Sequence, residues 1–246
     1  MIWRVEHFRE IDSTNSWLAA RASGGASEGL VALADFQSAG RGRLDRQWRA
    51  PARSALLCSI LLRPKVDVDQ LQLVIAAVAL SARSTLVRLC GLRPQLKWPN
   101  DLVLGDNKLA GVLGEVVTTS EGLAMVVGLG INLTQRPEDL PSTCVLDETG
   151  ITLSARGLLD ILLEELEGRY AQLDSLEGRA VLHAQYEKAL VTLGQRVRIE
   201  RLNDVVVGEA RGIDGAGRLI VDVDGLEMIL STGDVVHLRP QLGASA

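Results

Sequence analysis

QLKWPNDLVLGDNKLAGVLGEVV, residues 95–117, alternates apolar runs with turn signals and thereby predicts paired β-strands. The turn at Gly105–Asn107 is expected to fold residues 108–117 back, antiparallel, onto residues 95–104. A second turn, SEG, leads into LAMVVGLGINL, residues 123–133, which predicts a further strand. This succession of tight turns indicates a sheet in which most neighbouring strands run antiparallel.

Further strands and helices are predicted on both sides of these hairpins. The apolar run at residues 54–64 indicates a buried strand, and residues 69–90 place their apolar side chains along one side of a helix that Gly91 would end. Because strands and helices interleave without a regular βαβ rhythm, we expect an α+β fold with a mixed or antiparallel sheet flanked by helices. The remaining elements are expected at residues 12–22 (helix), 30–36 (strand), from Ser154 onward (helix) and 177–193 (helix).

The last part of the chain has a different sequence pattern. After Gly194, short strands alternate with turns such as DGAG and DG, which predicts a small all-β module. We therefore expect two domains, residues 1–193 and residues 194–246.

Composition limits the classes of function. The chain has 246 residues and a net charge of −5, so a nucleic-acid partner is not expected. The longest uninterrupted apolar run, Leu73–Leu80, is too short to span a bilayer, and the N-terminus lacks a signal-peptide core. The three cysteines are far apart in sequence and form no metal-binding motif. We expect a cytoplasmic protein with reduced thiols and no membrane association.

Lysine is scarce, and two lysines fall in one short window. Of 26 basic residues only four are lysine, and Lys97 and Lys108 both lie within residues 97–111. The hairpin turn could return Lys108 toward Asp101, while Pro99 favours an extended Trp98. A compact ammonium group can follow a moving phosphoryl group. A plain hairpin with polar turn residues is the alternative.

The segment FQSAGRGRLDRQW, residues 36–48, combines glycines with arginines. Arg41, Arg43 and Arg46 offer planar cationic forks suited to phosphate or carboxylate. The segment is not a P-loop, because G-x-x-x-x-G-K-[ST] is absent. An exposed basic loop without a ligand is the alternative interpretation.

The strand end VVGLGINL, residues 126–133, carries two glycines but no third at the dinucleotide-binding spacing. A ligand packed closely over Gly128 and Gly130, with Asn132 in reach, is one interpretation; a core strand with a bulge is the other. Helix capping alone explains Ser13. The three histidines are scattered and no G-x-S-x-G element occurs, so hydrolytic chemistry is not indicated.

Taken in order, these segments resemble the biotin protein ligases. The motifs that carry the resemblance are DSTN at residues 12–15, Q-x-A-G-R-G-R at 37–43, KWPND at 97–101, KLAG at 108–111 and G-x-G-I-N at 128–132. The resemblance implies the synthetase-like fold of biotin and lipoate ligases for residues 1–193 and an SH3-like β-barrel for residues 194–246. The chain departs from the family pattern at Leu44–Asp45, where a glycine often follows G-R-G-R, and the loop keeps its basic character.

The resemblance implies a two-step reaction. The biotin carboxylate would attack the α-phosphate of ATP and release pyrophosphate; a lysine of a biotin carboxyl carrier protein would then attack the biotinyl-adenylate. Lys108 and Arg43 are the expected catalytic residues, Lys108 at the reacting oxygens and Arg43, with Arg41, at the phosphate. Asp101 is expected to hold Mg²⁺ or to position the leaving pyrophosphate.

The substrate-binding residues follow from the same resemblance. Ser13, Thr14 and Gln37 would hydrogen-bond the ureido ring of biotin, and Asn15 and Asn132 would support the adenylate. Trp48 and Trp98 could wall the pocket or pack in the core. The full set expected to bind biotin or ATP is Ser13, Thr14, Asn15, Gln37, Gly40, Arg41, Gly42, Arg43, Trp48, Lys97, Asn100, Asp101, Lys108, Gly111, Gly130 and Asn132.

Some features stay open at this point. The early position of Asp12–Asn15 leads us to expect a ligase-only form, without the N-terminal DNA-binding domain of some members. Monomer and homodimer are both compatible with the resemblance. A lipoate or octanoate ligase or transferase is the nearest alternative function, although Ser13, Thr14 and Gln37 favour the polar ureido group of biotin. A ligand-binding regulator without turnover is a more distant one.

Overall fold

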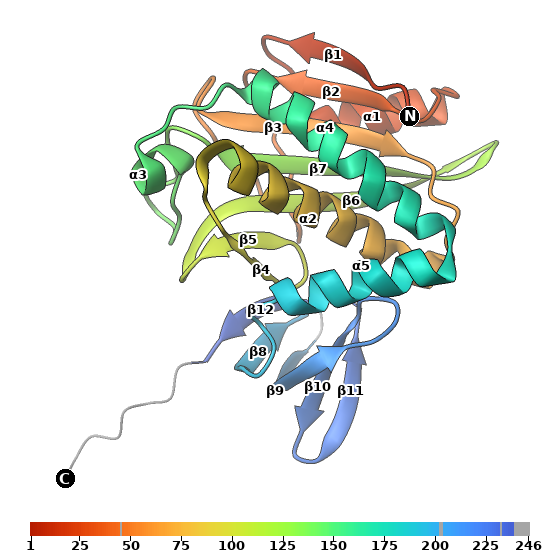
Figure 1. Ribbon diagram of the computed structural model, residues 1–246, viewed down its shortest axis with the longest axis vertical. Coiled ribbons are helices and arrows are strands. Elements are labelled where there is room, and N and C mark those ends of the chain that lie inside the picture. Colours follow the sequence, from red (N-terminus) through yellow and green to blue (C-terminus); the bar gives the residue numbers. More distant parts are fainter. Residues whose placement is uncertain (45, 202–203, 232, 239–246) are drawn as a thin grey trace.

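The computed structural model describes residues 1–44, 46–201, 204–231 and 233–238. Its larger sheet has seven strands in the order β1-β2-β3-β7-β6-β5-β4 (Figure 1). Only β1 and β2 pair in parallel; every other neighbouring pair is antiparallel, so the predicted mixed sheet is confirmed. The strands are β1 (Arg4–Phe8), β2 (Leu30–Ala34), β3 (Ala55–Leu62), β4 (Gln95–Lys97), β5 (Asp101–Leu104), β6 (Asn107–Thr119) and β7 (Gly122–Asn132).

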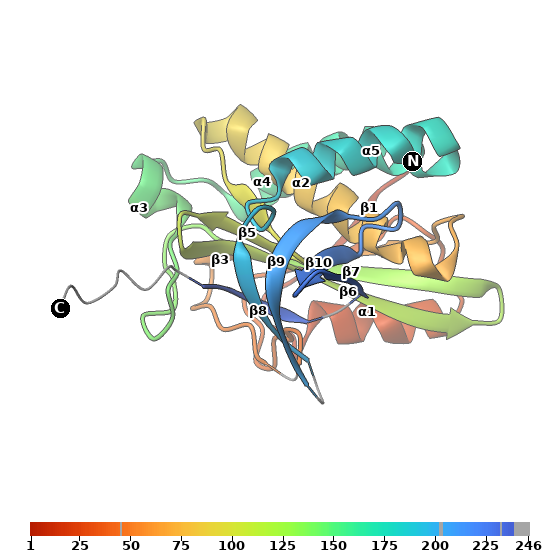
Figure 2. The same ribbon diagram turned by 90° about the horizontal axis from the view of Figure 1, so that it is seen from below.

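Helices cover the two faces of this sheet unequally. Helices α2, α4 and α5 lie on one side, whereas α1 lies alone on the other (Figure 2). A short helix, α3, follows β7 at the rim of the sheet. The helical segments are α1 (Thr14–Ser23), η1 (Val68–Gln70), α2 (Leu71–Cys90), α3 (Val145–Thr149), α4 (Ala155–Ala171), η2 (Gln172–Asp174) and α5 (Leu176–Ala189).

The sequence of β7 shows which residues face each group of helices. Side chains alternate along a strand, so residues with odd and even numbers face opposite ways. Met125, Val127, Leu129 and Ile131 belong to the main core, which also contains the buried residues of α2 and α4. Ala124 and Val126 instead pack with Leu18 and Ala22 of α1. Farther along the α1 side come two glycines, Gly128 and Gly130, which are closely covered by the side chains of Asn15 and Trp48.

Helix α2 supplies the centre of the main core. The segment Val68–Cys90 is long and apolar enough, by length and composition alone, to cross a membrane, with a mean hydropathy of 1.7. Eleven of its side chains are buried in the protein, between the sheet and α4, which accounts for the apolar composition. The helix ends as predicted at Gly91, whose φ of 71° is left-handed.

Two elements differ from the prediction. Residues 95–104 are not one strand but two, β4 and β5, which pair with each other across a turn at Trp98–Asn100 containing a cis Trp98–Pro99 bond. Pro99 supplies no backbone donor for a continuing strand. Helix α5 ends at Ala189 rather than at residue 193, because Leu190 and Val191 leave the helix to pair with Leu96.

The C-terminal strands form a second, five-stranded antiparallel sheet, consistent with an SH3-like fold. It packs against the turn between β4 and β5, where the buried Trp98 Nε1 donates a hydrogen bond to the carbonyl of Gly217 (3.1 Å). The boundary at residue 193 stays a prediction. The strands are β8 (Arg196–Glu200), β9 (Val205–Ile213), β10 (Leu219–Val223), β11 (Leu226–Leu230) and β12 (Asp234–His237), in the order β11-β10-β9-β8-β12.

Candidate functional site

The N-terminus of α1 carries a buried group of polar side chains. Ser13 is the N-cap residue, and its hydroxyl accepts a hydrogen bond from the backbone N–H of Ser16, as helix capping requires. Thr14 and Asn15, in the first turn, are 3% and 4% exposed and point toward the sheet rather than toward solvent. Polar groups buried this deeply need partners from other elements.

Gln37 and β3 provide the first partners. The Gln37 side-chain oxygen accepts hydrogen bonds from the backbone N–H (2.8 Å) and the hydroxyl (2.9 Å) of Thr14. The hydroxyl of Ser59, on β3, lies 2.6 Å from Thr14 Oγ1 and 2.5 Å from Asn15 Oδ1. Two of the motifs that the sequence separates by more than twenty residues are thus joined by direct hydrogen bonds.

The β6–β7 hairpin completes this polar network. Asn15 Nδ2 donates to Glu115 Oε2 (2.7 Å), and Glu115 also pairs with Arg41, whose Nη2 lies 2.7 Å from Oε1. The network therefore runs from Gln37 through Thr14, Ser59 and Asn15 to Glu115. It ends at Arg41, the first arginine of the glycine- and arginine-rich segment at residues 36–48, called the basic loop below.

The glycines on this side of the sheet are needed for close approach. A Cβ at Gly128 would overlap Asn15 Oδ1, and one at Gly130 would overlap the indole ring of Trp48. Gly111, paired with Gly130 across β6 and β7, also lies under the Trp48 ring. The register of β7 with both neighbours is regular, so the bulge considered for this segment does not occur. Protein side chains lie over the glycines where a ligand was expected.

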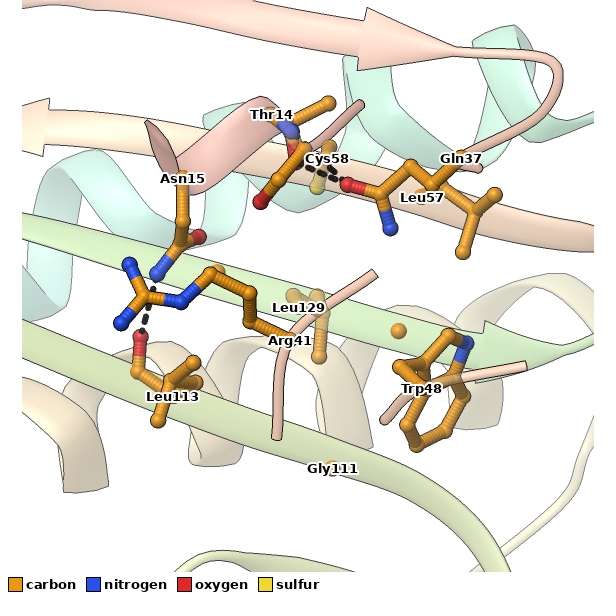
Figure 3. Close-up of a pocket in the computed structure, with 13 residues that line it drawn as sticks. Thr14, Asn15, Gln37, Arg41, Trp48, Leu57, Cys58, Gly111, Leu113 and Leu129 are labelled. Atoms are coloured by element: carbon orange, nitrogen blue, oxygen red, sulfur yellow. Dashed lines mark hydrogen bonds between the residues drawn. The ribbon is translucent and has the colours of Figure 1, made fainter. Parts of the chain in front are cut away.

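A small pocket lies among these residues (Figure 3). Its volume is about 30 Å³. Figure 3 shows Arg41 and Trp48, both from the basic loop, lying over the strands on the open side. The polar residues at this pocket are Ser13, Thr14, Asn15, Gln37 and Arg41.

A much larger cavity, of about 590 Å³, adjoins the small pocket through Arg41, Trp48 and Gly111, which line both. Arg43 and Lys108 both line it, so the two expected catalytic cations face one space. Other predicted residues on its walls are Gly42, Lys97, Asn100, Asp101 and Asn132.

Lys108 returns to Asp101 as the hairpin predicted. Its Nζ lies 2.6 Å from Asp101 Oδ1 and 5.7 Å from the centre of the Trp48 ring. The Lys108 side chain is 39% exposed, so the ammonium group keeps access to the cavity. The ion pair holds the lysine at the junction of the two spaces.

Arg43 is held by two parts of the chain. Its Nη1 donates to Asn100 Oδ1 (3.2 Å) and to the carbonyl of Gly233 (3.1 Å), next to β12. Burial lowers the pKa of Arg43, although the nearby carboxylates of Asp234 and Asp101 oppose this. A guanidinium remains charged in spite of such a shift, and it gains strength as a donor because less water screens it.

Asn132 places a buried amide side chain at the wall of the larger cavity. The residue is 2% exposed, and its Nδ2 donates to the carbonyl of Thr143 (3.0 Å). Its Oδ1 is buried and has no hydrogen-bond partner within the part of the chain that the structure describes. A buried acceptor of this kind suits a donor group of a ligand.

Two predicted residues lie elsewhere. Gly40 is packed under the backbone of Trp48, where a Cβ would overlap the Trp48 carbonyl, so it shapes the loop rather than either space. Trp98 is 1% exposed and packs in the main core, which decides between its two interpretations.

The sequence analysis did not identify four residues that the structure places at the site. Ser59 was a detectable candidate, because it is the one hydroxyl residue in the apolar strand Ala55–Leu62. Glu115 follows Gly111 at alternate positions and so shares its face of β6. Cys58 also lines the small pocket, but burial raises the pKa of its thiol to about 12, which keeps it neutral. Nothing in the sequence indicated that β12, through Asp234, would line the larger cavity.

Among the described residues, no three His, Cys, Asp or Glu side chains cluster as they would around a metal ion. Asp101 and Asp106 both line the larger cavity, and Asp101 is already paired with Lys108. A preformed protein cage for a cation is therefore not evident in these parts of the chain.

Family models match both parts of the chain. The family model for the biotin/lipoate A/B protein ligase family matches residues 7–132, and that for the biotin protein ligase C terminal domain matches residues 192–238. The biotin–[acetyl-CoA-carboxylase] ligase of Mycobacterium tuberculosis is 39% identical over 96% of this chain and 90% of its own length. The bifunctional ligase/repressor BirA of Escherichia coli is 34% identical over 88% of this chain and 68% of its own length.

A solved structure extends the likeness to three dimensions. The biotin protein ligase from Aquifex aeolicus, in complex with biotin and ATP, superimposes with a TM-score of 0.82 and 26% identity, over 97% of this chain and all of the other. The resemblance in sequence thus holds for both sheets. The chain belongs to the biotin/lipoate A/B protein ligase family.

Proposed function

We infer that this chain is a biotin protein ligase, an enzyme that activates biotin with ATP to biotinyl-5′-AMP and transfers biotin to a lysine of a carrier protein. The main support for the roles of individual residues is that Arg43 and Lys108 line a single cavity, which adjoins a small pocket of ordered hydrogen-bonding groups. The cavity supplies the cations, and the small pocket supplies directional polar contacts.

We propose that the small pocket receives the bicyclic ring of biotin. The ureido group has both donors and an acceptor, and Ser13, Thr14 and Gln37 offer complementary groups that are already fixed by neighbours. Such preorganisation lowers the entropic cost of binding. A lipoyl or octanoyl chain has no group that could use these contacts and would leave buried polar atoms unpaired.

The larger cavity is assigned to the nucleotide. Both chemical steps concentrate negative charge, so the protein must contribute cations and positioning rather than a nucleophile. Lys108 would stabilise charge at the carboxylate and α-phosphate oxygens, and Arg43 would hold the adenylate phosphate. The unpaired Oδ1 of Asn132 and the ring of Trp48 are suited to a nucleobase or ribose.

The basic loop would then act as the cover of the site. Arg41, Arg43 and Trp48 come from this one segment and reach both spaces. Closure over the adenylate would keep water from the mixed anhydride until a lysine arrives.

Mg²⁺ is proposed to arrive with ATP. Mg²⁺ in nucleotide sites is typically bound through substrate phosphates and one or two carboxylates. Asp101 fits that role at the cavity wall, provided that its carboxylate exchanges Lys108 for the cation. When bound, the ion would neutralise phosphate charge and help the pyrophosphate to leave.

We propose a biotin carboxyl carrier protein as the macromolecular partner and the cytoplasm as the compartment. The name of the Mycobacterium tuberculosis relative refers to acetyl-CoA carboxylase, which supports a carboxylase carrier. The three cysteines are unpaired, which is compatible with a reducing compartment. The net charge of −5 disfavours a nucleic-acid partner, and size-exclusion chromatography would decide between monomer and homodimer.

The test is ligand-dependent ATP–pyrophosphate exchange, measured in parallel with biotin, lipoate and octanoate. We expect exchange with biotin alone, followed by transfer of labelled biotin to an apo carrier domain. Exchange driven by lipoate or octanoate would favour the alternative ligase, and biotin binding without exchange or transfer would favour a regulator without turnover.

A further inference from the structure

Arg41 and Glu115 form a two-contact ion pair at the edge of the small pocket. Arg41 Nη2 lies 2.7 Å from Glu115 Oε1, and Nη1 donates to Oε2 at 3.2 Å. Figure 3 shows the Arg41 side chain extending from the basic loop toward Asn15 and Leu113. This pair joins the loop directly to the central sheet.

Glu115 is tied to the binding residues on its other side as well. It lies on the same face of β6 as Gly111 and Leu113, which line the small pocket. Its Oε2 accepts a hydrogen bond from Asn15 (2.7 Å), whose own Oδ1 lies next to Ser59. The carboxylate therefore has a partner on α1 besides Arg41, and it belongs to a strand of the central sheet, whereas Arg41 belongs to a loop.

The pocket beneath Arg41 is too small for an organic ligand. A volume of about 30 Å³ accommodates water but no bicyclic ring. Most of the other walls are strand residues with a regular register, including Gly128 and Gly130. The side chains that can open it without distorting the sheet are those of the loop, Arg41 and Trp48.

We propose that Glu115 is a positioning residue that holds Arg41, and with it the basic loop, over the small pocket, and that the pair opens before biotin enters. The released guanidinium then has an anionic group of the substrate as its partner in place of Glu115. This inference rests on the proposed biotin ligase function. It gives Glu115 a role in the access of biotin to the small pocket and none in the chemical steps.

The size of the effect follows from the exposure of the pair. The two side chains are 49% and 23% exposed, so solvent screens the attraction, and such a pair biases the closed form by a factor of about two to five. Since only the open fraction binds ligand, removing the carboxylate charge raises the apparent association rate by the same factor. Dissociation changes little, because the pair is absent from the bound form.

The experiment uses the full-length protein and stopped-flow tryptophan fluorescence, with Trp48 at the pocket as the reporter. Glu115→Gln keeps an acceptor for Asn15 but removes the charge that holds Arg41. We expect association with biotin, measured without ATP, to be about two to five times faster than in the wild type, with a dissociation rate within about 1.5-fold. Unchanged or slower association overturns the proposal.

Two further variants make the result specific. Glu209→Gln removes a carboxylate that pairs with Arg211 (2.7 Å) in the C-terminal sheet, and we expect it to leave both rate constants unchanged. Glu115→Asp keeps the charge on a shorter side chain; we expect association between the wild-type and Glu115→Gln rates. If Glu115→Gln does not fold in a thermal unfolding control, the Asp variant decides, and wild-type association in it counts against the proposal.

The outcomes separate the two hypotheses. A wild-type protein that shows no response to biotin contradicts the proposed function itself. Normal wild-type binding with no effect of either Glu115 variant contradicts the holding role alone.

Discussion

The two faces of the central sheet are built from the same strands and have different uses. On β3, Leu56 and Ile60 face α2 and are fully buried in the main core, whereas Ser59, between them, faces α1 and joins a hydrogen-bond network. On β7, Leu129 lies on the α2 side and Gly130 on the other, under Trp48. Adjacent residues of one strand thus have different roles: one packs in the core, and the next faces the polar side of the sheet.

The comparison indicates where the stability and the function of this enzyme are located. The α2 face buries large side chains and contributes mainly free energy of folding, since each buried leucine is removed from water. The α1 face carries glycines and small polar residues, over which Asn15 and Trp48 pack closely beside the small pocket. Substitutions on the α2 face should therefore lower the free energy of unfolding, whereas substitutions on the α1 face should lower ligand binding or activity.

The largest expected effect is on the α2 face. Leu56→Ala removes a fully buried side chain, and we expect it to lower the free energy of unfolding by about 2–5 kcal/mol, because a cavity remains in a close-packed core. Chemical denaturation measures the loss. Pyrophosphate exchange per folded molecule should stay near the wild-type rate; a loss of exchange in the fully folded variant would break the separation between the faces.

The next effect is on chemistry. Lys108→Ala should raise the barrier to adenylate formation by at least ~2 kcal/mol, by analogy with the loss of an oxyanion donor, while stability changes little because the lysine is partly exposed. Single-turnover formation of biotinyl-adenylate measures it, with the exposed Lys188→Ala as the control. Adenylate formation at the native rate would remove Lys108 from the mechanism.

A comparable effect is expected on retention of the intermediate. Arg43→Ala removes a partly buried cation that Asn100 and Gly233 hold in place, and dissociation of biotinyl-adenylate should become faster by the equivalent of about 1.5–3 kcal/mol. Arg53→Ala, which breaks an exposed pair with Asp35, serves as the control. An unchanged dissociation rate would limit Arg43 to a structural role.

The smallest expected effect is on the affinity for biotin. Thr14→Val keeps the shape of the side chain and removes the hydroxyl that donates to Gln37. We expect a loss of about 0.5–1.5 kcal/mol in biotin affinity, by isothermal titration calorimetry, because the Gln37 acceptor loses one of its donors. Equal affinity for biotin in the variant would show that this network orders the protein without contacting the ligand.

Much of this arrangement could be predicted from the sequence, where local signals agree. Gly91 marked the end of α2, Ser13 marked the start of α1, and the turn at Gly105–Asn107 brought Lys108 to Asp101. Each depends on residues near in sequence, for which turn and capping chemistry is sufficient.

The rest depends on contacts between distant segments. Ser59 meets Asn15, and Asn15 meets Glu115, only because β3, β7 and β6 are adjacent under α1, an order that periodicity does not specify. The contribution of Asp234 to the larger cavity depends likewise on how the C-terminal sheet packs on the first. The short turn at Trp98–Asn100 was misjudged because its flanking residues alternate as a single strand would.

A double-mutant cycle on Arg43 and Lys108 tests most directly whether these two cations act on one phosphate ester. The measurement is the affinity of a non-hydrolysable biotinyl-adenylate analogue for the wild type, Arg43→Ala, Lys108→Ala and the double variant. We predict weaker binding in each single variant and a coupling of at least about 0.5 kcal/mol, as expected for groups that share a partner. Wild-type affinity in both single variants, or fully additive losses, would contradict it.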